Sequence, residues 1–293
     1  MQLIDAQIVQ AQESFPLRIR AIVGVVALVL AVAPATVARA PGCTVIACLA
    51  TLPQMKSMPP PKAPCLGDGV SGKRVQLFYG QVLGQPDQSP SMIDRIRGAA
   101  DAVNQAYRQA GNQNVRWACT SSGQTVIHVV VPTNTFGAAV ATLRSLGYTS
   151  PDRIYTVLET GPSPNDLVGQ GNLPRNDRPT NNIADTGPWY SIVWGVDAST
   201  LMHEEGHNMG AVQNSAPHAS GAGHCYQRND VMCLYDGGPY FQHGGRMTSC
   251  NDGQTLADEW DCGRDDYYNP APSPGSYLAT HWNLYNSAFL SPN

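Results

Sequence analysis

Apolar and polar positions along the first two thirds of the chain alternate in a way that predicts strands and helices in turn. Four short apolar runs are typical of strands: residues 74–79, 124–131, 153–158 and 190–194. Between the first two runs, residues 91–110 carry apolar side chains at helical spacing, namely Ile93, Ile96, Ala100, Val103 and Tyr107. A second helix is expected over residues 135–146. Strands that alternate with helices predict a sheet with helices packed on it.

Three other parts of the chain lack this periodicity. Residues 161–187 are rich in Gly, Pro, Asn and Asp, which indicates a long surface loop or a poorly paired edge of the sheet. From Gln213 onward, periodic segments are few and turns are many. Residues 53–64 are rich in proline, which favours extended backbone and indicates a linker or a short pro-segment over residues 41–72. We therefore expect the folded domain to begin near Lys73.

The segment His203-Glu204-Glu205-Gly206-His207 contains the residues best suited to chemistry. Side chains four positions apart lie on the same face of a helix, so His203 and His207 can bind one metal ion. Glu204 is badly placed to be a third ligand. It is well placed to hold a water molecule that the metal acidifies, and so to act as the general base.

The residues on either side of this segment support a helix. Asp197 is a suitable N-cap, so a helix that begins near Ala198 would carry the motif in its second and third turns. Gly210 can adopt a left-handed conformation and end the helix. Further along, the sequence Asp230-Val231-Met232-Cys233 places a methionine in a short turn.

The order His-Glu-x-x-His-x-x-Gly followed by a methionine turn resembles the metzincin clan of zinc endopeptidases, closely over residues 197–235. The resemblance implies an α+β protease domain over residues 73–293. Its upper part (73–212) would contain a mixed, twisted sheet with packed helices, including the active-site helix. Its lower part (213–293) would be rich in loops and stapled by disulfides. It also implies a secreted, bacterial-type enzyme that binds Zn2+ and cleaves a protein or peptide substrate, with Glu204 as the catalytic base.

The third metal ligand is the point at which the chain departs from the metzincin pattern. Metzincins place His or Asp three residues after the glycine, where this chain has Gln213. Its neutral carbonyl oxygen is a poor zinc ligand beside imidazoles. We expect His218 to join His203 and His207, because it follows the turn soonest and Pro217 stiffens its approach. The alternatives are His224 and, behind it, Gln213, an aspartate such as Asp230, or no third protein ligand.

Two further residues or groups are candidates for the site. Several metzincins use a tyrosine two residues after the turn methionine to stabilise the oxyanion; here that position is Leu234, and Tyr235 lies next to it. A structural calcium ion is a further candidate cofactor, with Asp261, Asp265 and Asp266 as its ligands. Their spacing matches no known calcium loop, so a solvated acidic turn is the expectation.

Composition excludes one class of partner. The chain of 293 residues has a net charge of −4 and only 14% charged residues. It therefore lacks the basic surface that binds phosphate backbones, and we expect no nucleic-acid partner.

The N-terminal residues predict export. Arg18 and Arg20 precede an apolar run over residues 21–38, and Ala35 ends the better of the candidate cleavage sites. Residues 1–40 are thus expected to be a signal peptide. If uncut, they would anchor the domain to a membrane.

Eight cysteines fit an oxidising compartment. The expected pairs are Cys43–Cys48, Cys65–Cys119, Cys225–Cys233 and Cys250–Cys262. In another interpretation, the thiolate of Cys65 occupies the zinc in a latent form, as in the cysteine switch of some metzincins.

Two functions of different class follow from these observations. The first is an active secreted zinc endopeptidase. The second is an exported, non-catalytic binding or structural domain on a metzincin scaffold with an impaired metal site. Gln213 favours the second function and Glu204 the first, because a binding protein has no need of a catalytic base. Hydrolysis of a non-peptide substrate is a third possibility.

Overall fold

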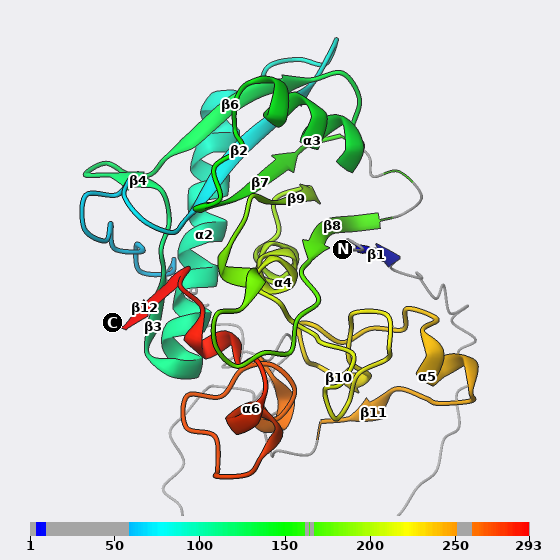
Figure 1. Cartoon of the computed structure of the whole chain (residues 1–293). Coiled ribbons are helices and arrows are strands. Elements are labelled where there is room, and N and C mark those ends of the chain that lie inside the picture. The colour runs from blue at the N-terminus through cyan, green and yellow to red at the C-terminus, as the bar shows by residue number, and fades with distance from the viewer. Residues whose placement is uncertain (1–3, 10–58, 162–163, 165–166, 251–259, 293) are drawn as a thin grey trace, which may run out of the picture. The chain divides into compact units, whose positions relative to one another are not determined.

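The computed structural model describes residues 4–9, 59–161, 164, 167–250 and 260–292. Its main element is a six-stranded sheet (Figure 1). The strands follow the order β1 (Ile4–Val9), β8 (Leu167–Leu173), β9 (Trp189–Trp194), β7 (Arg153–Glu159), β2 (Arg74–Val82) and β6 (Val126–Val131). Strands β9, β7, β2 and β6 are parallel, whereas β8 runs antiparallel to β9 and β1 antiparallel to β8. The fold is therefore mixed α+β with a mostly parallel sheet.

Helices cover both faces of this sheet. Alternate residues of a strand point to opposite sides, and here both sides carry apolar side chains that pack against helices. Leu77 of β2 belongs to one hydrophobic cluster, together with residues of α2 (Ser89–Gly111) and α4 (Ala198–Asn208). Phe78, the next residue, belongs to a second cluster with residues of α3 (Phe136–Ser145). The predicted strands and helices up to residue 158 are confirmed, with ends that differ by a few residues.

The segment 161–187, for which the sequence left open a long surface loop or a poorly paired edge of the sheet, contains a strand whose position the sequence did not indicate. Strand β8 pairs with β9 through Gly169↔Val193, Gln170↔Ile192 and Gly171↔Ser191. Glycine and amide side chains carry no strand signal of their own. Pairing with β9 and packing against α4 stabilise β8, and neither contact can be read from the segment itself.

The remaining elements are short, and those after residue 213 agree with the loop-rich C-terminal part that was expected. They are β3 (Gln113–Val115), β4 (Cys119–Thr120), β5 (Gly123–Gln124), η2 (Ile183–Asp185), β10 (Gln227–Arg228), α5 (Pro239–Gln242), β11 (Thr248–Ser249), η3 (Cys262–Arg264), α6 (Tyr277–Thr280), η4 (Leu284–Asn286) and β12 (Leu290–Pro292). Strand β12 pairs antiparallel with β3, beside the end of α2. Leu77 and Phe289 belong to the same hydrophobic cluster, so the C-terminal residues complete the core beneath the sheet.

Three of the four expected disulfides are present, namely Cys65–Cys119, Cys225–Cys233 and Cys250–Cys262. The fourth, Cys43–Cys48, lies outside the described residues. The latent-form interpretation of Cys65 is wrong, because its sulfur is bonded to Cys119. This bond and a hydrogen bond from the backbone N–H of Ala63 to Asp101 (2.8 Å) hold the segment before β2 against the domain.

Within the described ranges, no helix combines the length and apolarity needed to cross a membrane. The expected signal peptide and its cleavage sites fall outside those ranges, apart from the strand β1.

Candidate metal centre

Helix α4 carries the motif, and its first residues fold as their chemistry predicts. The side chain of Asp197 accepts a hydrogen bond from the backbone N–H of Thr200 (2.8 Å), which confirms it as the N-cap. At the other end, Gly210 has a φ of +95°. A Cβ atom there would lie 2.8 Å from the indole nitrogen of Trp282, which donates to the carbonyl of Met209. Glycine thus lets the chain turn sharply after the helix.

Three histidines converge beside α4. Ring nitrogens of His203, His207 and His224 all lie within 4.8 Å of one another. The Nε2 atoms of His207 and His224 are 3.1 Å apart. All three side chains are buried, with at most 4% of each residue exposed. This group has the composition and spacing to hold a metal ion.

A hydrogen bond fixes the other nitrogen of each ring. The Nδ1 atom of His203 lies 2.6 Å from the carbonyl oxygen of Val231, and that of His207 lies 2.7 Å from the carbonyl of Ala211. Nδ1 of His224 lies 2.9 Å from a carboxylate oxygen of Asp236. Because these oxygens only accept, each Nδ1 carries a proton, and the Nε2 atom of a neutral ring is then the one that presents a lone pair. This is the arrangement found around metal-bound histidines.

The electrostatics of the group also fit a bound cation. Burial lowers the pKa of His203 to about 3, with a further contribution from His224, and burial likewise lowers the pKa of His207. The Nε2 atoms of His207 and His224 are close enough for one cation to contact both. His203 Nε2 is buried and has no hydrogen-bond partner among the described residues. A metal ion would satisfy all three nitrogens at once.

Glu204 follows His203 on α4, and its side chain is fully buried. Neither carboxyl oxygen has a hydrogen-bond partner in the described part of the chain. Strand β8 packs directly on this group: a Cβ atom at Gly169 would collide with Oε1, and one at Gly171 would lie 2.8 Å from Oε2. Burial, and then the neighbouring Glu205, raise the pKa of Glu204. Only glycines at these two positions leave room for the carboxyl group.

Glu205 has a different role, because the next side chain on a helix points about 100° away. It accepts a hydrogen bond from the hydroxyl of Thr156 on β7, which in turn lies 2.8 Å from the hydroxyl of Ser191 on β9. Burial raises the pKa of Glu205 to about 8. Asn208 adds two hydrogen bonds to the sheet, to the carbonyls of Asn172 and Tyr190. These contacts hold α4 against the sheet.

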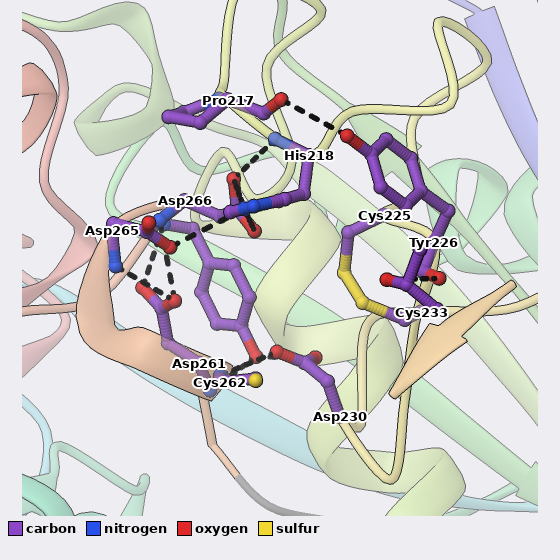
Figure 2. A network of polar contacts seen from close by, with 12 residues as sticks. Pro217, His218, Cys225, Tyr226, Asp230, Cys233, Asp261, Cys262, Asp265 and Asp266 are labelled. Atoms are coloured by element: carbon purple, nitrogen blue, oxygen red, sulfur yellow. Dashed lines mark hydrogen bonds and ion pairs between the residues drawn. A yellow bond between two sulfur atoms is a disulfide. The ribbon is translucent and has the colours of Figure 1, made fainter. Parts of the chain in front are cut away.

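The structure places His218 away from the three-histidine group. Its backbone N–H donates to Asp266 (2.8 Å), and its Nδ1 atom lies 3.1 Å from Oδ2 of the same residue (Figure 2). His224 takes the third position instead. The backbone N–H of Val212 bonds to the carbonyl of Gly223 (3.2 Å), which returns the chain to the end of α4. The expectation for His218 rested on its short distance along the chain, whereas the folding of the loop decides which ring reaches the helix.

The side chain of Gln213, which stands where metzincins have the third ligand, forms hydrogen bonds with backbone groups. Its Nε2 atom donates to the carbonyls of Pro174 (2.9 Å) and Gly210 (2.8 Å), and its Oε1 atom accepts from the N–H of Asn176 (3.0 Å). This buried amide therefore fastens the segment after β8 to the turn after α4. It is not a member of the histidine group.

The other candidate residues also lie outside the three-histidine group. Tyr235 is 66% exposed and its ring packs on Phe241. Asp265 and Asp266 form a separate group with His218 that has the spacing to hold a cation. Asp261 is not part of it, because its carboxylate accepts backbone N–H groups, including that of Tyr267. A third group, Cys225, Asp230 and Cys233, offers no thiolate because its two sulfurs form a disulfide.

Comparison with known proteins found no matching family model and no matching curated protein. The function is therefore inferred from the geometry of this centre.

Proposed function

We propose that the protein is a secreted zinc endopeptidase of the metzincin type, with His203, His207 and His224 as the zinc ligands and Glu204 as the general base. The observation that carries the proposal is the convergence of three buried imidazoles, together with a buried carboxyl group, on the residue after His203, that has no protein partner among the described residues. Three imidazole nitrogens suit zinc, and three protein ligands are typical of catalytic rather than structural sites. When bound, zinc acidifies a water molecule and polarises a carbonyl group.

The roles of the protein residues follow from their contacts. The Glu204 carboxylate has no competing hydrogen bond, so it can take a proton from water and pass it to the leaving amine. The Nδ1 contacts of the three histidines hold the rings in a single tautomer. Glu205 and Asn208 keep α4 fixed on the sheet, and so fix the helix that carries His203, Glu204 and His207.

Strand β8 supports a peptide as the substrate. It lies against Glu204, and β1 pairs antiparallel with its outer edge, which shows that this edge can accept a strand. Because β1 belongs to the expected signal peptide 1–40, cleavage would free the edge for a peptide. An extended peptide bound there by main-chain hydrogen bonds would pass close to the catalytic base. The three disulfides fit the oxidising environment of a secreted protein.

The alternative of a non-catalytic binding domain depended on Gln213. Because His224 occupies the third position and Glu204 is retained, the observations favour hydrolysis.

The test is elemental analysis of the purified protein together with hydrolysis of a denatured protein substrate. We expect one zinc ion per chain and hydrolysis that a chelator abolishes and added zinc restores. A wild-type protein that is correctly folded but binds no zinc would overturn the proposal and favour the binding-domain alternative. Zinc binding without hydrolysis of any peptide would overturn only the assignment as a protease.

A further inference from the structure

The turn that carries Met232 is closed by a buried carboxylate. Oδ1 of Asp230 accepts hydrogen bonds from the N–H of Met232 (2.7 Å) and the hydroxyl of Tyr267 (2.8 Å). Its Oδ2 accepts one from the N–H of Cys262 (2.8 Å). Only 5% of Asp230 is exposed. One side chain therefore shapes the turn and ties it to the segment 261–268, which comes some thirty residues later in the chain (Figure 2).

This turn presents one atom to the metal centre. Val231, between Asp230 and Met232, directs its carbonyl oxygen to Nδ1 of His203 at 2.6 Å. Nδ1 of His207 contacts the carbonyl oxygen of Ala211, just beyond the same helix, and Nδ1 of His224 contacts the side-chain carboxylate of Asp236. His203 thus differs from the other two rings, because its orientation depends on a backbone atom from a separate loop.

Tyr267 and Asp261 fix the position of Asp230 through further hydrogen bonds. The Tyr267 hydroxyl donates to Asp230 and accepts from the N–H of Asp261 (2.7 Å). The Asp261 carboxylate accepts the N–H of Tyr267 (2.7 Å) and also that of Tyr268. Figure 2 shows Asp261, Cys262 and Asp230 within this network of polar contacts. The path from Asp261 through Tyr267 and Asp230 to the turn consists of hydrogen bonds between buried groups, which leave little freedom in the position of the Val231 carbonyl.

We propose that Asp230 and Tyr267 are positioning residues for the metal centre. They hold the Val231 carbonyl where it fixes the tautomer and the direction of the His203 ring. This inference rests on the proposed function only in taking His203 as a metal ligand. Partners of this kind typically change metal affinity by about 10- to 100-fold when they are removed.

The variant Tyr267→Phe tests the proposal with the least disturbance, since it removes a hydroxyl and keeps the ring. The matched control is Tyr268→Phe. The hydroxyl of Tyr268 is also buried, and it donates to Gln113 of β3 (2.9 Å) instead of Asp230. Both variants lose one buried hydroxyl, so a general loss of stability affects both, whereas a positioning role affects only Tyr267.

Two measurements separate the outcomes. Zinc affinity by competition with a chelator should fall about 10-fold in Tyr267→Phe and in Asp230→Asn, and stay at the wild-type value in Tyr268→Phe. The ring 15N shifts of His203 in the metal-free protein should show the Nδ1–H tautomer in wild type and a mixture in the first two variants. Equal affinities in Tyr267→Phe and Tyr268→Phe, or an unchanged His203 tautomer, would overturn the inference. If the wild type binds no zinc, the proposed function fails, and the tautomer still decides whether Asp230 and Tyr267 orient His203.

Discussion

The Nδ1 atom of His224 lies 2.9 Å from Oδ2 of Asp236, and the two side chains are both almost fully buried. Asp236 also accepts hydrogen bonds from the hydroxyl of Ser220 and the N–H of Gly238 (2.8 Å). Burial acts to raise the pKa of Asp236, but these hydrogen bonds, with that of His224 first, outweigh it and lower the pKa. Asp236 is therefore an ionised carboxylate that holds the third histidine in place.

Replacement of this carboxylate should weaken metal binding. In Asp236→Asn, an acceptor oxygen is kept but the negative charge is lost, so we expect zinc affinity to fall by about 10-fold. Chelator competition measures this change. Asp152→Asn is the control, since that carboxylate pairs with Lys73 at the surface (2.8 Å) and its loss should leave zinc affinity unchanged. Equal affinities in all three proteins would contradict the role assigned to Asp236.

The two candidate third histidines make opposite predictions. His224→Ala removes one of three converging nitrogens, and we expect the purified variant to lose its zinc on dialysis. His218→Ala should retain one zinc ion per chain, because His218 bonds to Asp266 outside the group. Elemental analysis of both variants decides between them. Zinc loss in His218→Ala alone would reverse the assignment.

The two adjacent glutamates should differ in catalysis. Glu204→Gln removes the base and keeps the ligands, so we expect bound zinc with hydrolysis reduced by about 10²- to 10⁴-fold. Glu205→Gln keeps an oxygen that can accept from Thr156, and should retain most of the activity. The comparison uses initial rates on one peptide substrate at equal zinc content. Equal losses in the two variants would mean that Glu204 has no special role.

The glycines of β8 provide a steric test of the same carboxyl group. In Gly169→Ala, the added methyl group would collide with Oε1 of Glu204, so the carboxyl group must move. We expect activity to fall by about 10-fold or more, because a misplaced catalytic group is less effective, while the zinc content stays unchanged. Gly98→Ala, in α2, meets no atom within 4 Å and should leave activity unchanged. Full activity in Gly169→Ala would show that Glu204 does not need its observed position.

The pair of His218 and Asp266 should make stability depend on pH. The hydrogen bond to Asp266 raises the pKa of His218 above its usual value of 6.5, although burial acts in the opposite direction. A raised pKa in the folded state means that the protonated ring stabilises the fold. This contribution is complete below pH 6.5 and is lost as the pH rises through the raised pKa.

Urea unfolding of wild type and His218→Gln at a series of pH values measures this effect. We expect the wild type to be the more stable protein at pH 5.5, and the difference to shrink toward pH 8.5. A stability difference that is constant over this range would show that the charge on His218 does not contribute.

The sequence by itself determined the elements that are stabilised by residues close to one another along the chain. Local hydrogen bonds and backbone preferences account for the N-cap Asp197, the turn at Gly210 and the helix between them. This helix places His203 and His207 on one face, with Glu204 directly after His203. Likewise, the periodic apolar residues predicted the parallel strands and the helices that cover them. The two short-range disulfides, Cys225–Cys233 and Cys250–Cys262, could be expected because few residues separate their cysteines.

The tertiary structure decided whatever depends on contacts between distant segments. His224 rather than His218 meets the helix because hydrogen bonds within the loop, such as Val212 to Gly223, return the chain at that point. Strand β8 exists through its pairing with β9, and its glycines are explained only by the carboxyl group of Glu204 across from them. Gln213 had a role that no spacing could show, since two of its three partners, Pro174 and Asn176, come from a segment almost forty residues earlier. Local preferences act over a few residues, whereas the burial of polar groups requires partners that only the folded chain brings together.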